Sequence, residues 1–75
     1  MISFTKALDS LEACCFVKME SYLTPLKQLG WRVTVRPQHD ARAEPLVAEA
    51  PELVDAVTLA AAKTMRAGWM SPIDG

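Results

Sequence analysis

The strict alternation of apolar and polar residues in segment 30–37 predicts a β-strand with one buried face. The two alternating sets are Trp31, Val33 and Val35, and Arg32, Thr34 and Arg36. Pro37 cannot donate to a sheet ladder, so we expect the strand to end there. The apolar set then faces a core, and two arginines project from the other face.

Two longer stretches carry the spacing of three to four residues that is typical of amphipathic helices. The stripe of the first helix, over residues 4–22, comprises Phe4, Ala7, Leu8, Leu11, Cys15, Met19 and Tyr22. Phe16 and Val17 lie beside this stripe, where they would pack on a second surface or form a binding patch. The stripe of the last helix, between Pro51 and Gly68, comprises Leu53, Val54, Val57, Ala60, Ala61 and Thr64.

The connections complete the predicted fold. Thr24 and Pro25 suit the start of a short helical turn over residues 26–29, which Gly30 would close in a left-handed conformation. Residues 42–48 would return as a second strand, placed at an edge by Pro45. We therefore predict an α+β fold over residues 1–75, a single α-β-β-α domain with two long helices on one face of a two-stranded antiparallel sheet. Because such a sheet is marginal alone, we expect two chains to form a homodimer by edge pairing into a four-stranded sheet.

Composition sets the class of protein. A chain of 75 residues that is 51% hydrophobic should fold, but its core is small, which favours binding to partners. The formal net charge of -1 argues against a general attraction to nucleic acid. The charge is nevertheless uneven, because residues 1–42 hold six basic and four acidic side chains and residues 43–75 hold two and five.

No stretch has the roughly 20 apolar residues of a membrane span, and the first residues do not resemble a secretion signal. We therefore expect a cytoplasmic protein with no membrane partner. Cys14 and Cys15 are adjacent and cannot close a stabilising loop, so we interpret them as small buried residues in a reducing compartment.

No arrangement of residues indicates catalysis. His39 is the single histidine and is expected in a turn beside Asp40, where a solvated pair is the simpler interpretation. Three glycines cannot build a loop that cradles phosphate, and no serine has a histidine nearby in the sequence. We predict a protein that is not an enzyme, with no catalytic residue, no metal site and no cofactor.

Two sets of residues are candidates for binding. The first is the arginine face, Arg32 and Arg36 with Arg42 beyond the turn, which would meet phosphates or an acidic protein surface. The second is a surplus of apolar side chains in which Phe16, Trp69 and Met70 stand out. An exposed sheet face and internal burial are the structural alternatives. The segment 69–75 is expected to dock on its own domain or on a partner.

The order of the segments resembles small phage-encoded proteins of the ABA-sandwich type. Segment 30–35 is similar to their first strand and segment 48–63 to the region that forms their last helix, and the likeness covers residues 20–67. It implies a phage or prophage origin and carries over no functional residue. Small phage proteins, including anti-CRISPR proteins, commonly act as stoichiometric binders. By that analogy we expect a non-catalytic inhibitor that binds a host protein complex. The alternative is a nucleic-acid-binding regulator that uses Arg32, Thr34 and Arg36.

Overall fold

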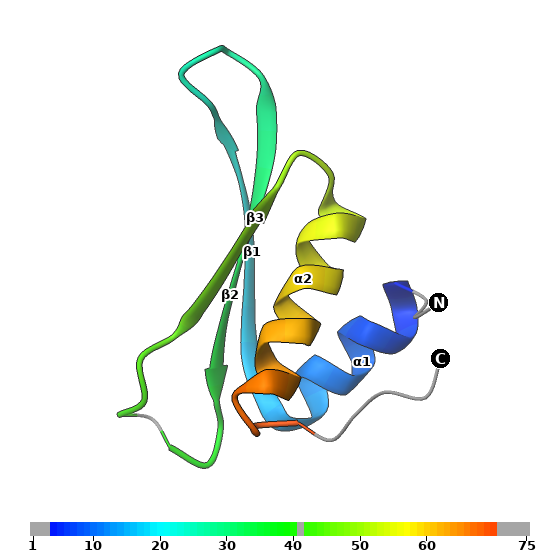
Figure 1. The fold of residues 1–75 in the computed structure, drawn as a ribbon, viewed down its shortest axis with the longest axis vertical. Helices are drawn as coiled ribbons and strands as arrows, with labels where there is room; N and C mark the ends of the chain where they lie inside the picture. Colours follow the sequence, from blue (N-terminus) through cyan, green and yellow to red (C-terminus); the bar gives the residue numbers. More distant parts are fainter. Residues whose placement is uncertain (1–3, 41, 71–75) are drawn as a thin grey trace.

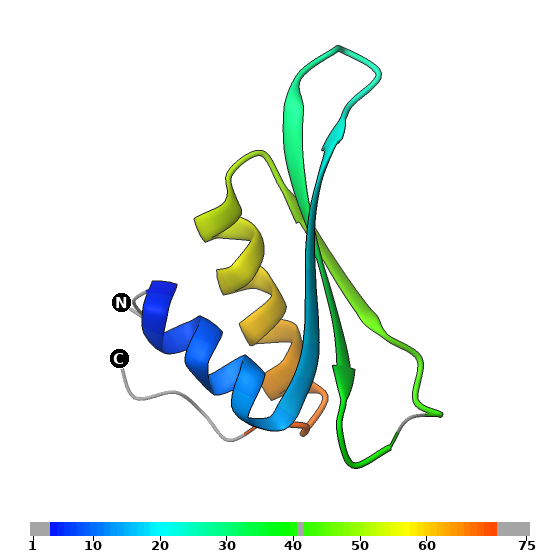
Figure 2. The same cartoon turned by 180° about the vertical axis from the view of Figure 1, so that it is seen from behind.

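A three-stranded antiparallel sheet with two helices on one face forms the domain (Figures 1 and 2). The computed structural model describes residues 4–40 and 42–70. The elements in chain order are α1 (Phe4–Cys14), β1 (Cys15–Leu23), β2 (Leu29–Pro37), β3 (Leu46–Ala50) and α2 (Leu53–Arg66). The strands lie in the order β1-β2-β3. The α+β class and the placement of both helices on one face agree with the prediction, whereas the two-stranded sheet does not.

The first predicted helix is wrong in its second half. α1 ends at Cys14, and β1 begins at Cys15 with no loop between them. β1 pairs with β2 along its whole length, from Cys15 opposite Pro37 to Leu23 opposite Leu29. The helical spacing of this segment coexists with a two-residue period and with the aromatic and β-branched residues that favour strands. The segment forms a strand and not a helix because all nine of its residues pair with β2.

The junction between α1 and β1 is held by Gln38 from the far end of β2. The Gln38 backbone N–H donates to the Cys14 carbonyl oxygen at 3.1 Å, and its side-chain Nε2 donates to the Cys15 carbonyl oxygen at 3.3 Å. These bonds satisfy backbone acceptors at the point where the helix becomes a strand.

The short helix predicted over residues 26–29 is instead the turn that joins β1 to β2. Lys27 N–H donates to the Thr24 carbonyl oxygen at 2.8 Å, and Thr24 N–H donates to the Gln28 carbonyl oxygen at 2.9 Å. Lys27 has a φ of 61°, so it takes the left-handed position that closes a three-residue hairpin loop. Gly30 lies inside β2, where a Cβ would be 3.0 Å from Cζ of Tyr22. Its lack of a side chain makes room for the tyrosine ring.

The second predicted strand forms as β3, but it begins at Leu46 rather than at residue 42. It pairs with β2 from Val35 opposite Leu46 to Trp31 opposite Ala50, which makes β2 the central strand. Because residues 15–23 also form a strand, the sheet has three strands and not two.

α2 follows the prediction closely. It ends at Arg66, and Gly68 has a φ of 80°, the conformation expected of a helix-ending glycine. Its buried residues are Ala56, Val57, Ala60, Ala61 and Thr64. Val54, expected in the core, is 50% exposed because the buried stripe is turned toward Ala56. The small side chains of this stripe allow α2 to approach the sheet closely.

The core lies between the helices and the sheet. Its largest fully buried apolar side chains include Leu11 from α1, Val33 and Val35 from β2, and Val57 from α2. Trp69 and Met70, which follow α2, are partly buried against this core. The rest of the segment 69–75 lies outside the described residues.

Candidate binding surface

The face of the sheet that carries no helix is the candidate site (Figures 1 and 2). Even-numbered residues of β1 and β2 and odd-numbered residues of β3 share this face, because neighbouring residues alternate between the two sides of a strand. The pairs across β1 and β2 on this face are Phe16 and Arg36, Lys18 and Thr34, Glu20 and Arg32, and Tyr22 and Gly30. Val47 and Glu49 of β3 extend the rows of Thr34 and Arg32.

One half of this face is a closed polar cluster around Arg32. Its Nη1 lies 3.6 Å from Oε1 of Glu20, and its Nη2 lies 3.3 Å from Oε2 of Glu49. The guanidinium carbon is 4.9 Å from the centre of the Tyr22 ring, within range of a cation–π contact. The positive charge of Arg32 is therefore already paired with two carboxylates from both neighbouring strands.

Tyr22 belongs to the same cluster. Partial removal from water raises its pKa, and a hydrogen bond to Glu49 together with the charge of that carboxylate raises it further, against the opposing effect of Arg32. The phenol of Tyr22 is therefore neutral near neutral pH.

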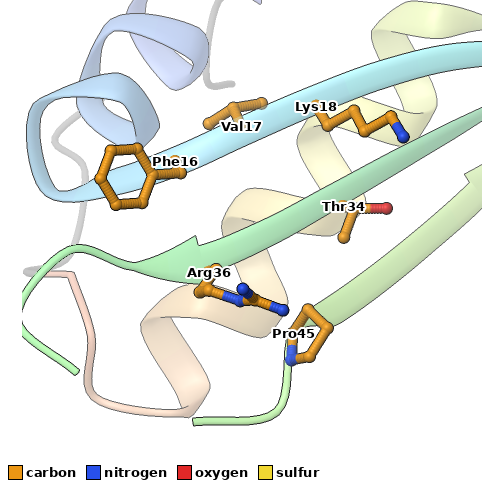
Figure 3. Close-up of a pocket in the computed structure, with 6 residues that line it drawn as sticks. All are labelled: Phe16, Val17, Lys18, Thr34, Arg36 and Pro45. Carbon is orange, nitrogen blue, oxygen red and sulfur yellow. The ribbon is translucent and has the colours of Figure 1, made fainter. Parts of the chain in front are cut away.

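The other half of the face is basic and aromatic, and we call it the Phe16 surface. It is a shallow depression of about 360 Å³ between the strands (Figure 3). Phe16 is 62% exposed, and Lys18 and Arg36 are exposed on either side of Thr34. Among residues 4–40 and 42–70, neither Lys18 nor Arg36 has a hydrogen-bond or ion-pair partner. The lining residues are Phe16, Val17, Lys18, Thr34, Arg36 and Pro45.

The structure brings together only part of the predicted site. Phe16 and Arg36 are cross-strand neighbours. Arg42 lies in the connection between β2 and β3, where its backbone N–H donates to Oδ1 of Asp40 at 3.0 Å. Trp69 and Met70 pack against the core and not on the open face of the sheet.

The sequence does not single out Lys18, because the helical pattern of residues 4–22 includes it. The signal that could have placed it in a strand is the alternation of Val17 and Met19 with Lys18 and Glu20.

The adjacent thiols have limited chemistry. The Sγ atoms of Cys14 and Cys15 are 3.4 Å apart, and Cys15 is 2% exposed. Burial raises the pKa of the Cys15 thiol to about 12. The hydrogen bond to Cys14 and the charge of the Cys14 thiolate add to this increase. Cys15 is therefore almost entirely protonated near neutral pH, and a protonated thiol is a poor nucleophile.

In the part of the chain that the structure describes, no group of three or more His, Cys, Asp or Glu side chains is arranged to hold a metal ion. Neither described helix has the length and apolar character needed to cross a membrane.

Comparisons of the chain with protein-family models, with curated proteins and with solved structures gave no match. The resemblance to small phage proteins therefore stays a prediction.

Proposed function

We propose that this protein is a non-catalytic protein-binding domain that docks its target on the Phe16 surface. One observation carries the proposal: on a single open sheet face, Arg32 is paired with two carboxylates, whereas Arg36 and Lys18 stand beside an exposed phenylalanine without partners among the described residues. A cation with no internal partner is available to an external one.

The surface indicates the chemistry of the target. Aromatic residues and arginine are enriched at the centres of protein interfaces, where a large apolar side chain anchors the contact and the guanidinium pairs with carboxylates. Phe16 would enter an apolar pocket, and Arg36 and Lys18 would pair with acidic side chains at its rim. We infer a target with an acidic surface around an apolar depression.

The resemblance to phage proteins supports the narrower form of this proposal. In that form the domain works in the host cytoplasm and inhibits a host protein complex by occluding a surface of it. The homodimer expected from the sequence is a separate proposal that does not depend on this target.

Paired affinity captures from a host lysate test the proposal. Wild-type protein, Phe16→Ala and Arg36→Glu are immobilised in equal amounts, and Arg66→Glu serves as a charge-matched control because Arg66 is exposed at the end of α2. We expect the two site variants to lose the same captured protein, which Arg66→Glu retains. Circular dichroism checks that each variant is folded. If all three variants captured the same proteins as the wild type, the Phe16 surface would not be the binding site.

Nucleic acid is the second candidate ligand, because an exposed aromatic ring beside two cations is a combination that single-stranded nucleic-acid binders use. The carboxylates of Glu20 and Glu49 on the same face, and the net charge of -1, weigh against it. Labelled single-stranded DNA and RNA at low salt distinguish the two candidates. Binding that weakens steeply with salt and is lost in Arg36→Glu would replace the protein target with a nucleic acid.

A further inference from the structure

β1 presents a long unpaired edge. It contributes nine residues, Cys15–Leu23, and among residues 4–40 and 42–70 it pairs only with β2 in the sheet order β1-β2-β3. The opposite edge is different, because Lys63 of α2 reaches β3 and its Nζ donates to the Val47 carbonyl oxygen at 2.8 Å. Open strand edges are templates for pairing with another chain, and proteins commonly cover them.

The backbone groups on this edge can be assigned from the ends of the ladder. Thr24 N–H donates to the Gln28 carbonyl oxygen at one end, and Gln38 N–H donates to the Cys14 carbonyl oxygen at the other. In an antiparallel pair successive residues direct their N–H and C=O groups alternately toward the partner and away from it. Even-numbered residues of β1 therefore bond to β2, and the residues that direct these groups outward are Cys15, Val17, Met19, Ser21 and Leu23. The carbonyl oxygen of Cys15 already accepts from Nε2 of Gln38, so the groups left for a further strand lie mainly from Val17 to Leu23.

We propose that this edge pairs with the same edge of a second copy of the chain, antiparallel, about a two-fold axis at Met19. The result is one six-stranded sheet with all four helices on one face. The inference does not depend on the proposed function, and it leaves Arg36 as the unpaired cation of the Phe16 surface within the described residues, because Lys18 and Phe16 would then also contact the second copy.

Charge selects this register. Only residues that direct their N–H and C=O groups outward can bond to the second copy, and in β1 these are the odd-numbered ones. An odd-numbered residue must therefore lie opposite an odd-numbered residue, which places the two-fold axis at a residue and not between two residues. An axis at residue 18 would set Lys18 against Lys18, and an axis at residue 20 would set Glu20 against Glu20. With the axis at Met19, each Lys18 lies opposite Glu20 of the second copy, and opposite charges at such positions stabilise a sheet. This register also pairs the full strand with itself.

The side chains on both faces agree with this register. On the open face, Phe16 lies opposite Tyr22 of the second copy, a cross-strand aromatic pair. On the helix face, Met19 is 39% exposed and Leu23 is 71% exposed. Pairing sets Met19 against its own counterpart and brings Leu23 beside Cys15 of the second copy, where α1 begins to cover the sheet. A second copy therefore covers apolar side chains that one chain leaves in water.

Charge reversal at the two facing positions provides the test, with molecular mass read by sedimentation equilibrium over a concentration series. Wild type is expected to dimerise. Lys18→Glu and Glu20→Lys each create like-charge pairs at two symmetry-related positions, so each alone should dimerise at least tenfold more weakly. An equimolar mixture of the two variants should form a heterodimer, and the double variant should dimerise as wild type does. Arg36→Glu, a reversal on the same face of the central strand, should leave the dimer intact.

A second variant addresses the backbone. Met19→Pro removes an outward N–H without removing a bond to β2, so it should abolish the dimer while the monomer stays folded by circular dichroism. A wild-type protein that stays monomeric at hundreds of micromolar would overturn the inference, as would single reversals that dimerise as tightly as wild type. The readout is molecular mass, so a failure of the dimer is distinguishable from a failure of the proposed target binding, which is read by affinity capture.

Discussion

Arg32→Ala and Arg36→Ala are expected to differ in stability although the two arginines lie on the same strand and the same open face. Arg32 pairs with Glu20 at 3.6 Å and with Glu49 at 3.3 Å, and its guanidinium lies over the ring of Tyr22. Arg36 has no such partner among the described residues. Alanine has the same low strand propensity at both positions, so the difference isolates the interactions of Arg32.

The expected magnitude follows from exposure. The side chains of the two ion pairs are 39–46% exposed, so each pair contributes about 0.2–1 kcal/mol. The cation–π contact adds about 0.5–1 kcal/mol. Arg32→Ala should therefore reduce the free energy of unfolding by about 1–3 kcal/mol, whereas Arg36→Ala should change it by less than about 0.5 kcal/mol. In a domain of this size 1 kcal/mol corresponds to about 4–8 °C in Tm.

Urea denaturation followed by circular dichroism measures the difference. All proteins are compared at one concentration, because self-association would shift the apparent stability. Raising the salt concentration should reduce the cost of Arg32→Ala, since exposed ion pairs are screened. A double-mutant cycle with Glu49→Gln should show a coupling between residues 32 and 49. If both alanine variants lost the same free energy within about 0.3 kcal/mol, the polar cluster would not stabilise the fold.

Three further predictions concern the core, the turn and the buried thiol. Leu11→Ala should reduce the free energy of unfolding by about 2–4 kcal/mol in urea denaturation, because Leu11 is fully buried and its removal leaves a cavity. Ala13→Gly, on the exposed side of α1, should reduce it by about 1 kcal/mol. Equal losses of free energy would contradict the burial of Leu11 in the core. Lys27→Gly should raise Tm, because glycine takes the left-handed backbone conformation of Lys27 without the strain of about 1 kcal/mol that a side chain brings. Lys27→Ala should not raise Tm. A lower Tm for the glycine variant would contradict the left-handed conformation of residue 27. The Cys15 thiol has its pKa raised from 9.0 to about 12, so the folded state holds this proton more tightly than the unfolded state, and stability should be intact below pH 9 and fall between pH 9 and 12 by at most about 1.4 kcal/mol per pH unit. Cys15→Ala should flatten that fall in alkaline denaturation, and an unchanged slope would show that this thiol is not its source.

The two-residue period identified β2, and the open-face arginines could be named before the fold was known. This period could not show that Arg32 forms ion pairs within the domain. Its partners Glu20 and Glu49 lie 12 and 17 positions away in the sequence, and they are brought to Arg32 by the pairing of β2 with β1 and with β3. Nor could the sequence place Lys18 on the open face of the sheet, since the pattern of the segment that carries Lys18 also fits a helix. The Phe16 surface exists because β1 and β2 pair in one register, which sets Phe16 opposite Arg36.

Local physics alone determined β2, α2 and the stop at Gly68, because side-chain period, helix dipole and backbone freedom act between near neighbours in the chain. The same local rules predicted α1, which is the first half of the helix expected over residues 4–22. Tertiary structure decided the segment 15–23, whose pattern fits a helix and a strand, and chose the strand because nine residues could pair with β2. It also decided which arginine is bound within the domain and which faces outward, since ion pairs and open edges depend on what lies alongside in space.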